Sequence, residues 1–391
     1  MQNIIENIVK IKSMICIPDP FNPLQKKYLE YYGNGFFIND NGYILTCYLL
    51  VKHSLDIYIN IYPNFNDNYH ANIVSICPEK DIALLKINKS HMYKPLELGD
   101  SENIKIGDTI CFVHRNSKSN ITQINKYFFI NEKYPIESYG CPVFNLNHKL
   151  IGIHKIILTN DNFINVVIPI SHIFSILVEL FNNKIVYVPQ IFIDINNQFV
   201  ITNIHDFSPL LGKNIKKSDI ILNINGYRDL DELKFSSNVN DNYKIQYVDS
   251  FDNKIHKIKL KPSSNNIFPI RYIGFPFENL DYTIINGVIF MQLKMDHLIN
   301  IDSLNLDKDK LYVFKKFNNL KNRLFSIVFI SHIMNNNIHN LKVGDIIATI
   351  NNKKVYKISD VNNIIMNILI KEKYCTIKTI FNEIKNFDLI T

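Results

Sequence analysis

The sequence has no tryptophan, only 12 glycines and no long run of apolar residues. No segment approaches the roughly 18 consecutive apolar residues that indicate a membrane-spanning helix, so no membrane span is expected. The first ten residues lack a basic start followed by a long apolar run, so no signal peptide is expected either. The exact compartment is unknown. We expect an intracellular protein, of the cytoplasm, the nucleus or an organelle, or a protein of a virion.

Clustered metal ligands and clustered charge are also lacking. The six cysteines include no Cys-x-x-Cys pair, and the 12 histidines show no metal-ligand spacing. We therefore expect no metal and no cofactor. The net charge of +7 comes from 43 basic and 36 acidic residues, and the basic residues form no long run. A surface for nucleic acid would favour a clustered basic patch, so proteins are the expected partners.

Short β-type runs dominate the first 180 residues. Hydrophobic residues make up 47% of the 391 residues, which is enough for the packed cores of two to four domains. The runs occupy residues 43–47, 56–62, 82–87 and 150–154. Many short strands with polar turns between them suggest a barrel or a sandwich. An apolar-periodic stretch at 171–181 predicts a helix that closes this first domain.

A repeated motif follows residue 182. Residues 218–226 read SDIILNING, and residues 343–352 read VGDIIATINN, so both place an acid before a strand and then a turn. Two related modules of about a hundred residues each are implied. We expect domains at 1–182, 183–262 and 263–391. The third carries an insertion at about 293–323 that is rich in Asp, Lys and Leu and is expected to be partly helical.

The order of these motifs resembles the HtrA/Deg family, in which a trypsin-like protease domain precedes PDZ domains. Residues 33–46, GNGFFINDNGYILT, are similar to the family's opening segment and the strand that leads to its catalytic histidine. Residues 81–86, DIALLK, resemble its aspartate motif, and residues 166–169, VVIP, resemble the exit to its closing helix. The resemblance covers essentially the whole chain and points to the plant and protist Deg branch. It implies a mainly β fold, with a chymotrypsin-like double β-barrel followed by two PDZ-like α+β domains.

The nucleophile loop departs from that family. Residues 137–143 read ESYGCPV where the family has GNSGGP, so Tyr139 stands at the serine position. The family's histidine follows Leu-Thr by two residues, and Leu49 stands there. Only Asp81 of the triad is kept. A leucine accepts no proton, and a phenol is bulkier than a serine and has a usual pKa of about 10.

The resemblance also implies a degenerate oxyanion hole around Glu137 and Gly140. Glu137 replaces the glycine that shapes the loop, and its carboxylate would oppose a developing oxyanion. Cys141 replaces another glycine. With base, nucleophile and hole all altered, we expect a catalytically inactive homologue that acts as a scaffold, assembly or protein-binding subunit.

Two other functions stay open at this point. The first is a serine-type endopeptidase, active or residually active, with a rearranged site built from Ser138 and His53 or from the thiol of Cys141. The second is chaperone-like binding of unfolded segments, which needs an exposed apolar groove but no triad.

Residues 113–131 leave little room for the family's longer segment, which predicts an abbreviated second barrel.

The PDZ resemblance implies a peptide-binding loop in the first module, at Gln190, Ile191, Phe192 and Ile193. Phe192 stands where a glycine is expected, so the cradle for a terminal carboxylate is expected to be defective. The second module, which runs from about Phe268 onward, is expected to serve assembly. The family resemblance implies a trimer or hexamer, or a subunit of a larger complex.

Overall fold

The computed structural model describes residues 2–61, 67–88, 96–113, 117–158, 163–238, 240–334, 341–369 and 372–389. The chain divides into two compact units. Unit 1 contains Met1–Cys16 and Tyr28–Asn265, and unit 2 contains Ile17–Lys27 and Asn266–Thr391. In the part of the chain that the structure describes, every helix is too short or too polar to cross a lipid bilayer.

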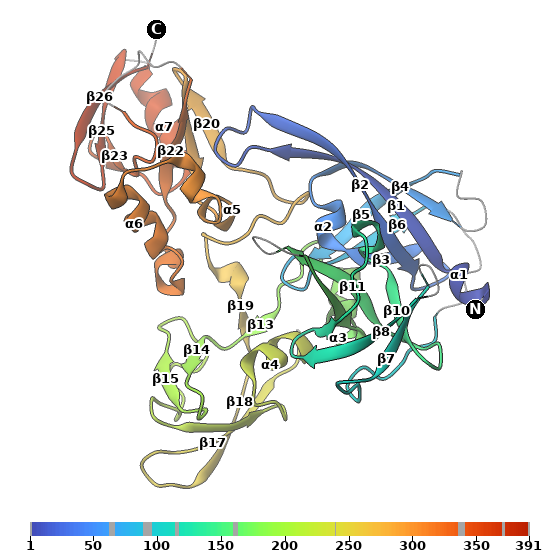
Figure 1. Ribbon diagram of the computed structural model, residues 1–391. Helices are drawn as coiled ribbons and strands as arrows, with labels where there is room; N and C mark the ends of the chain where they lie inside the picture. The colour runs from blue at the N-terminus through green and yellow to red at the C-terminus, as the bar shows by residue number, and fades with distance from the viewer. Residues whose placement is uncertain are drawn as a thin grey trace. The chain divides into compact units, whose positions relative to one another are not determined.

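Six strands of unit 1 close the first barrel, in the order β1-β2-β3-β6-β5-β4 (Figure 1). They are β1 (Ile8–Pro18), β2 (Lys26–Phe37), β3 (Tyr43–Cys47), β4 (Ser54–Ile61), β5 (Tyr69–Cys77) and β6 (Ile82–Ile87). Two short helices accompany them, α1 (Gln2–Ile5) and α2 (Tyr48–Val51). Side chains of β1 alternate between the core and the outside, as a half-buried strand requires. The barrel brings the end of β3 next to the start of β6, through the pair Cys47 and Ile82.

The second barrel is also complete, with the order β10-β11-β12-β9-β8-β7. Its elements are β7 (Thr109–Phe112), β8 (Ser117–Ile124), β9 (Phe128–Ile130), η2 (Ile136–Ser138), β10 (Pro142–Asn145), β11 (Leu150–Leu158), β12 (Phe163–Pro169) and the closing helix α3 (Ile170–Asn182). The expected abbreviation was therefore wrong. Strands β8 and β9 form a hairpin inside residues 113–131, because its turn needs only Asn125, Lys126 and Tyr127. The Asn125 side chain accepts the Tyr127 amide at 3.0 Å and tightens that turn.

The rest of unit 1 forms a small α+β module. Its elements are β13 (Pro189–Gln190), β14 (Ile193–Ile195), β15 (Ile201–Ile204), β16 (Ile220–Ile224), α4 (Leu230–Ser236), β17 (Tyr243–Val248), β18 (Ile255–Leu260) and β19 (Ser263–Ser264). Strand β13 enters the module and pairs with β19, which leaves it. We call residues 183–265 the first small module. Its separation from the barrels at residue 182 remains a prediction.

Unit 2 has the same kind of architecture with more elements. They are η3 (Asn265–Ile267), β20 (Tyr282–Ile285), β21 (Val288–Gln292), α5 (Met295–Leu298), η4 (Ile301–Leu304), α6 (Lys308–Lys316), η5 (Leu320–Leu324), β22 (Val328–Ile333), β23 (Ile347–Ile350), β24 (Lys353–Lys354), α7 (Ile358–Leu369), β25 (Tyr374–Thr379) and β26 (Ile384–Asp388). The sheets are β20-β21-β22 and β24-β23-β25-β26. Helices α5 and α6 lie within the segment expected to be an insertion.

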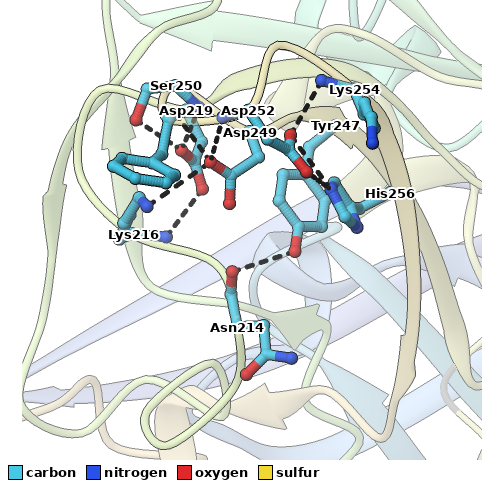
Figure 2. A network of polar contacts seen from close by, with 10 residues as sticks. Asn214, Lys216, Asp219, Tyr247, Asp249, Ser250, Asp252, Lys254 and His256 are labelled. Carbon is cyan, nitrogen blue, oxygen red and sulfur yellow. Dashed lines mark hydrogen bonds and ion pairs between the residues drawn. The ribbon is translucent and has the colours of Figure 1, made fainter.

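The repeated acid forms the same turn in both units. Asp219 accepts the Lys216 amide at 2.9 Å, and Asp345 accepts the Lys342 amide at 2.8 Å. Both aspartates are fully buried. Asp219 also accepts the amide and the hydroxyl of Ser250, which fastens the β17–β18 hairpin to this turn (Figure 2). The fold expected from the sequence is confirmed: two six-stranded barrels of the chymotrypsin type are followed by smaller α+β sheets consistent with PDZ domains.

Candidate functional site

The three positions that the resemblance assigns to a catalytic triad lie together in unit 1. Asp81 precedes β6, Leu49 lies in α2 just after β3, and the pairing of β3 with β6 brings them side by side. The Leu49 amide donates to Asp81 Oδ1 at 2.8 Å. The Tyr139 phenol donates to Asp81 Oδ2 at 2.5 Å. Asp81 is almost fully buried, while the Leu49 side chain is half-exposed and supplies no polar group.

A lysine that the sequence analysis missed completes this cluster. Lys155 Nζ lies 3.0 Å from Asp81 Oδ2, with only 13% of its side chain exposed. The Tyr127 ring lies 5.4 Å from the same ammonium. Burial opposes the charge of Lys155, but the charge and hydrogen bond of Asp81 together with the nearby Tyr127 and Cys47 outweigh it, and the pKa of Lys155 is raised above its ordinary value. Asp81 and Lys155 therefore form a largely buried ion pair.

The acid–base state of Tyr139 follows from the same contacts. Burial, and then the charge of Asp81, raise the pKa of the Tyr139 phenol well above its ordinary value. The phenol is thus held as a neutral donor to Asp81. A nucleophile would need the opposite shift, or a base to remove its proton.

Ser138 contacts a histidine, but this histidine is His154 on β11. Ser138 Oγ lies 3.1 Å from His154 Nδ1, and His154 Nε2 lies 2.9 Å from Asn165 Oδ1. Nucleophilic sites use the related orders Ser–His–Asp and Cys–His–Asn. All three side chains are buried, however, and Ser138 has no exposed surface. Its hydroxyl also donates to Pro135 O at 2.5 Å, so the arrangement braces the loop.

The backbone amides of the loop are used within the loop itself. In the 3₁₀ turn η2, the Ser138 amide donates to Pro135 O at 3.0 Å, and the Tyr139 amide donates to Ile136 O at 3.1 Å. Asn34 Nδ2 holds Glu137 O at 2.6 Å. An oxyanion hole needs an amide at the nucleophile position that points at the reacting oxygen. Here that amide already has an acceptor.

Gly140 and Cys141 complete the loop. Gly140 has φ +79, and a Cβ there would lie 2.2 Å from Asn34 O, so this glycine is required by the backbone. Its amide donates to His154 O at 2.9 Å. Cys141 is buried, so a substrate does not reach its thiol.

In the first small module, the four predicted peptide-binding residues form one segment at the start of β14. Phe192 has φ +52, in the left-handed region that favours glycine. Its ring packs edge-on against Phe207 at 5.1 Å. Ile191 O accepts the Ser208 hydroxyl, and Ile193 pairs with β15. The loop keeps a glycine-like conformation, but Ile191, Phe192 and Ile193 are buried and Gln190 is half-buried in β13.

In unit 2, two loop amides before β20 are bonded to carboxylates of the same unit. The Ile273 amide donates to Asp296 Oδ2 at 2.8 Å, and the Gly274 amide donates to Glu278 Oε2 at 2.9 Å. Arg271 pairs bidentately with Glu278, at 2.8 and 2.6 Å. Strand β20 also covers the edge of β21 that β22 does not use. In the first small module, by contrast, β14 pairs only with β15 among the described strands.

Within the described residues, one group has ligand atoms placed as a metal would need them, on the β17–β18 hairpin. Candidate ligand atoms of Asp249, Asp252 and His256 lie within 4.8 Å of one another. Figure 2 shows that these groups are already paired. Asp252 contacts His256 Nε2 at 3.0 Å, and Asp249 contacts the Lys216 ammonium at 3.4 Å. The Lys216 ammonium supplies the positive charge in this cluster, and the contacts among these residues stabilise the turn of the β17–β18 hairpin.

Three comparisons relate this chain to known proteins. A family model described as a trypsin-like peptidase domain matches residues 33–153. A probable periplasmic serine endoprotease, DegP-like, from Halomonas elongata is 29% identical over 145 residues, which is 33% of this chain and 30% of that protein. A DegP-like relative from Bartonella henselae is 21% identical over 379 residues, which is 86% of this chain and 69% of that protein. The match therefore spans about a third of the length of the Halomonas relative.

A solved structure supports the fold. The HtrA-type protease AlgW with a decapeptide superposes with a TM-score of 0.51 at 15% identity, over 68% of this chain and 97% of that one. The two barrels and the matched peptidase domain define a homologue of trypsin-like serine endoproteases. Within that class, the chain is a homologue of the HtrA/DegP-like family.

Proposed function

We propose that this protein is a catalytically inactive member of the HtrA/Deg lineage, of the plant and protist branch, that works as a protein-binding and assembly subunit. The observation that carries the proposal is the state of Asp81. Its carboxylate is taken by the Lys155 ammonium and the Tyr139 phenol, at 3.0 and 2.5 Å. A protease would need that carboxylate to orient an imidazole beside a hydroxyl.

The size of the effects supports the proposal. Disabling a triad member costs about 10⁴-fold or more in rate, and losing one oxyanion donor costs about 10²–10³-fold. Here Leu49 replaces the base, Tyr139 replaces the nucleophile, and the Tyr139 amide already donates to Ile136 O. Little catalysis is left once all three are changed.

A binding role rests on the difference between the two modules. In the first, β14 has an open edge among the described strands, and a peptide adds to such an edge as an extra strand. In unit 2, β20 pairs with the equivalent strand β21, and the carboxylates of Asp296 and Glu278 accept hydrogen bonds from loop amides. We assign peptide or protein binding to the first module and contacts between subunits to the second. The assembly is a homotrimer, a hexamer or part of a larger complex.

The test combines a fluorogenic casein assay with a serine-reactive fluorophosphonate probe on the purified full chain. We expect no turnover and no labelling, and a light-scattering mass above the 45.7 kDa of one chain. A light-scattering mass of one chain would contradict the assembly role.

A second candidate, residual activity at Ser138, rests on the 3.1 Å contact between Ser138 and His154. Labelling that disappears in Ser138→Ala would establish that candidate and end the main proposal. Suppression of aggregation by the same sample would add chaperone-like binding.

A further inference from the structure

The first small module carries a polar hollow that is separate from the open edge of β14. The hollow has a volume of about 830 Å³ and lies within unit 1. It is lined by residues of the sheet β16-β17-β18, by residues 236–238 and 240–242 at and after the end of α4, and by Glu102. Strand β14 belongs to another sheet, β14-β15 (Figure 1). Ligand sites have volumes of about 300–1,000 Å³, so the hollow has room for a ligand.

Strand alternation gathers lysines on the outer face of this sheet. The core side of β17 and β18 is apolar and aromatic, so the alternate residues Lys244, Lys257 and Lys259 are exposed on the outer face. Lys244 and Lys259 line the hollow and are directly opposite each other in the β17–β18 register. Like charges at such a pair destabilise a sheet. Among the described residues, none of the three has a carboxylate partner, and the lysines of this module that form ion pairs are Lys216 and Lys234.

The amide side chains on this face add further hydrogen-bond donors. Asn225 Oδ1 accepts the Lys244 amide at 2.8 Å, and Gln246 Oε1 accepts Asn223 Nδ2 at 2.9 Å. Both oxygens are therefore used, while Asn225 Nδ2 and Gln246 Nε2 have no acceptor among the described residues. The sheet thus presents ammonium and amide donors to the hollow, which is the set of groups that binds a carboxylate.

The loop after α4 presents acceptors instead. Asn238 Nδ2 donates to Asp241 Oδ2 at 2.9 Å, and Asn240 Nδ2 donates to Glu179. Each of these amides keeps its Oδ1 as an acceptor, and the carboxylates of Glu102 and Asp241 lie in the same lining. A ligand of the hollow therefore needs donors beside its anionic groups. A polypeptide has backbone N–H donors beside its side-chain carboxylates, whereas the sugar-phosphate backbone of DNA has no donor and would meet these two carboxylates.

We infer that the polar hollow binds an acidic segment of a partner polypeptide. The partner's carboxylates bind Lys244, Lys257 and Lys259, and its backbone amides donate to the acceptors of the loop. The inference rests on the proposed protein-binding function and adds the chemistry of the partner. A carboxylate bound between Lys244 and Lys259 removes their mutual repulsion, which gives a reason for two like charges to face each other across the strands.

Fluorescence anisotropy of a fluorescein-labelled glutamate octapeptide, titrated with the purified full chain at low salt, tests this site. We expect saturable binding that weakens as salt is added. Lys244→Gln/Lys259→Gln removes two charge-assisted contacts, so the dissociation constant should rise about tenfold or more. The control Lys213→Gln/Lys217→Gln removes the same charge from exposed lysines of this module outside the hollow, and its affinity should stay at the wild-type value.

Hydrogen exchange of the β17–β18 backbone amides accompanies the titration. Because Lys244 and Lys259 repel each other, the Lys244→Gln/Lys259→Gln variant should exchange these amides as slowly as wild type or more slowly. Faster exchange, absence of saturable binding, an equal loss of affinity in the two double variants, or tighter binding of an oligothymidylate of equal charge would each overturn the inference. If binding is absent while light scattering still gives a mass above one chain, the acidic-peptide site fails and the proposed assembly role stands.

Discussion

At the scale of single residues, Asp81 forms an ion pair with Lys155 and accepts the hydrogen of the Tyr139 phenol. Asp81 and Lys155 are both buried, and each is the other's counter-charge. The sequence suggested only that Asp81 keeps the aspartate position of the family's triad. Lys155 escaped notice because one lysine in the apolar run LIGIHKIIL has no pattern of its own. Only the fold brings Lys155, on β11 of the second barrel, next to Asp81 at the start of β6 in the first.

This pair predicts a stability effect. Asp81→Asn leaves the Lys155 ammonium buried and unpaired, which should cost about 3–5 kcal/mol of unfolding free energy. Because the folded pKa of Lys155 is raised, the pair's contribution is fully present below about pH 10 and is lost only as pH rises through the folded pKa. Urea unfolding at pH 7 measures it, with exposed Asp40→Asn as the control.

The double variant Asp81→Asn/Lys155→Met separates charge from packing. Since both buried charges are then gone, most of the lost stability should return. If the double variant is no more stable than Asp81→Asn alone, the ion pair does not explain the effect.

At the scale of elements, the strand and helix pattern of the sequence was a good guide. The runs at 43–47 and 82–87 are strands β3 and β6, and the helix expected at 171–181 is α3 (Ile170–Asn182). The expectation of an abbreviated second barrel was wrong. The family's segment at residues 113–131 is longer, but the β8–β9 hairpin of this chain needs only three turn residues. Tyr62 of the run at 56–62 lies outside the described residues. The assignment of Leu49 and Tyr139 to the histidine and serine positions stays a prediction.

The insertion in unit 2 has a testable anchor. Lys310 of α6 lies 2.6 Å from buried Asp345, and Lys385 lies 2.8 Å from its other oxygen. Lys310→Met should destabilise unit 2 by about 1–3 kcal/mol, less than a fully broken buried pair because Lys385 remains. Lys315→Met on the same helix breaks an exposed pair with Asp302 and should change stability by less than about 1 kcal/mol. Calorimetry compares the two, and equal losses would show that α6 is not held by Asp345.

At the scale of the whole molecule, the two barrels have the chymotrypsin fold, and the polar groups of the candidate site bond one another. The loop amide that would bind an oxyanion bonds Ile136, and the carboxylate that would orient a base bonds Lys155. Function resides in such sites and not in the frame. The sequence predicts, by resemblance to the family, that Leu49 and Tyr139 stand at the histidine and serine positions. It does not reveal the new bonds, which join residues far apart in the chain.

These bonds predict that restoring the missing side chains alone does not restore chemistry. The variant Leu49→His/Tyr139→Ser regains a base and a nucleophile. Lys155 still occupies Asp81 Oδ2, however, and the turn at η2 still directs its amides inward. We expect fluorophosphonate labelling of this variant to stay at the wild-type background. Labelling should rise only when Lys155→Ala and Glu137→Gly are added, because Asp81 is then free to orient the imidazole and the loop is free to re-form. Labelling of the double variant by itself would mean that the ion pair and the turn yield easily, and that the site lost its activity through two side chains and nothing more.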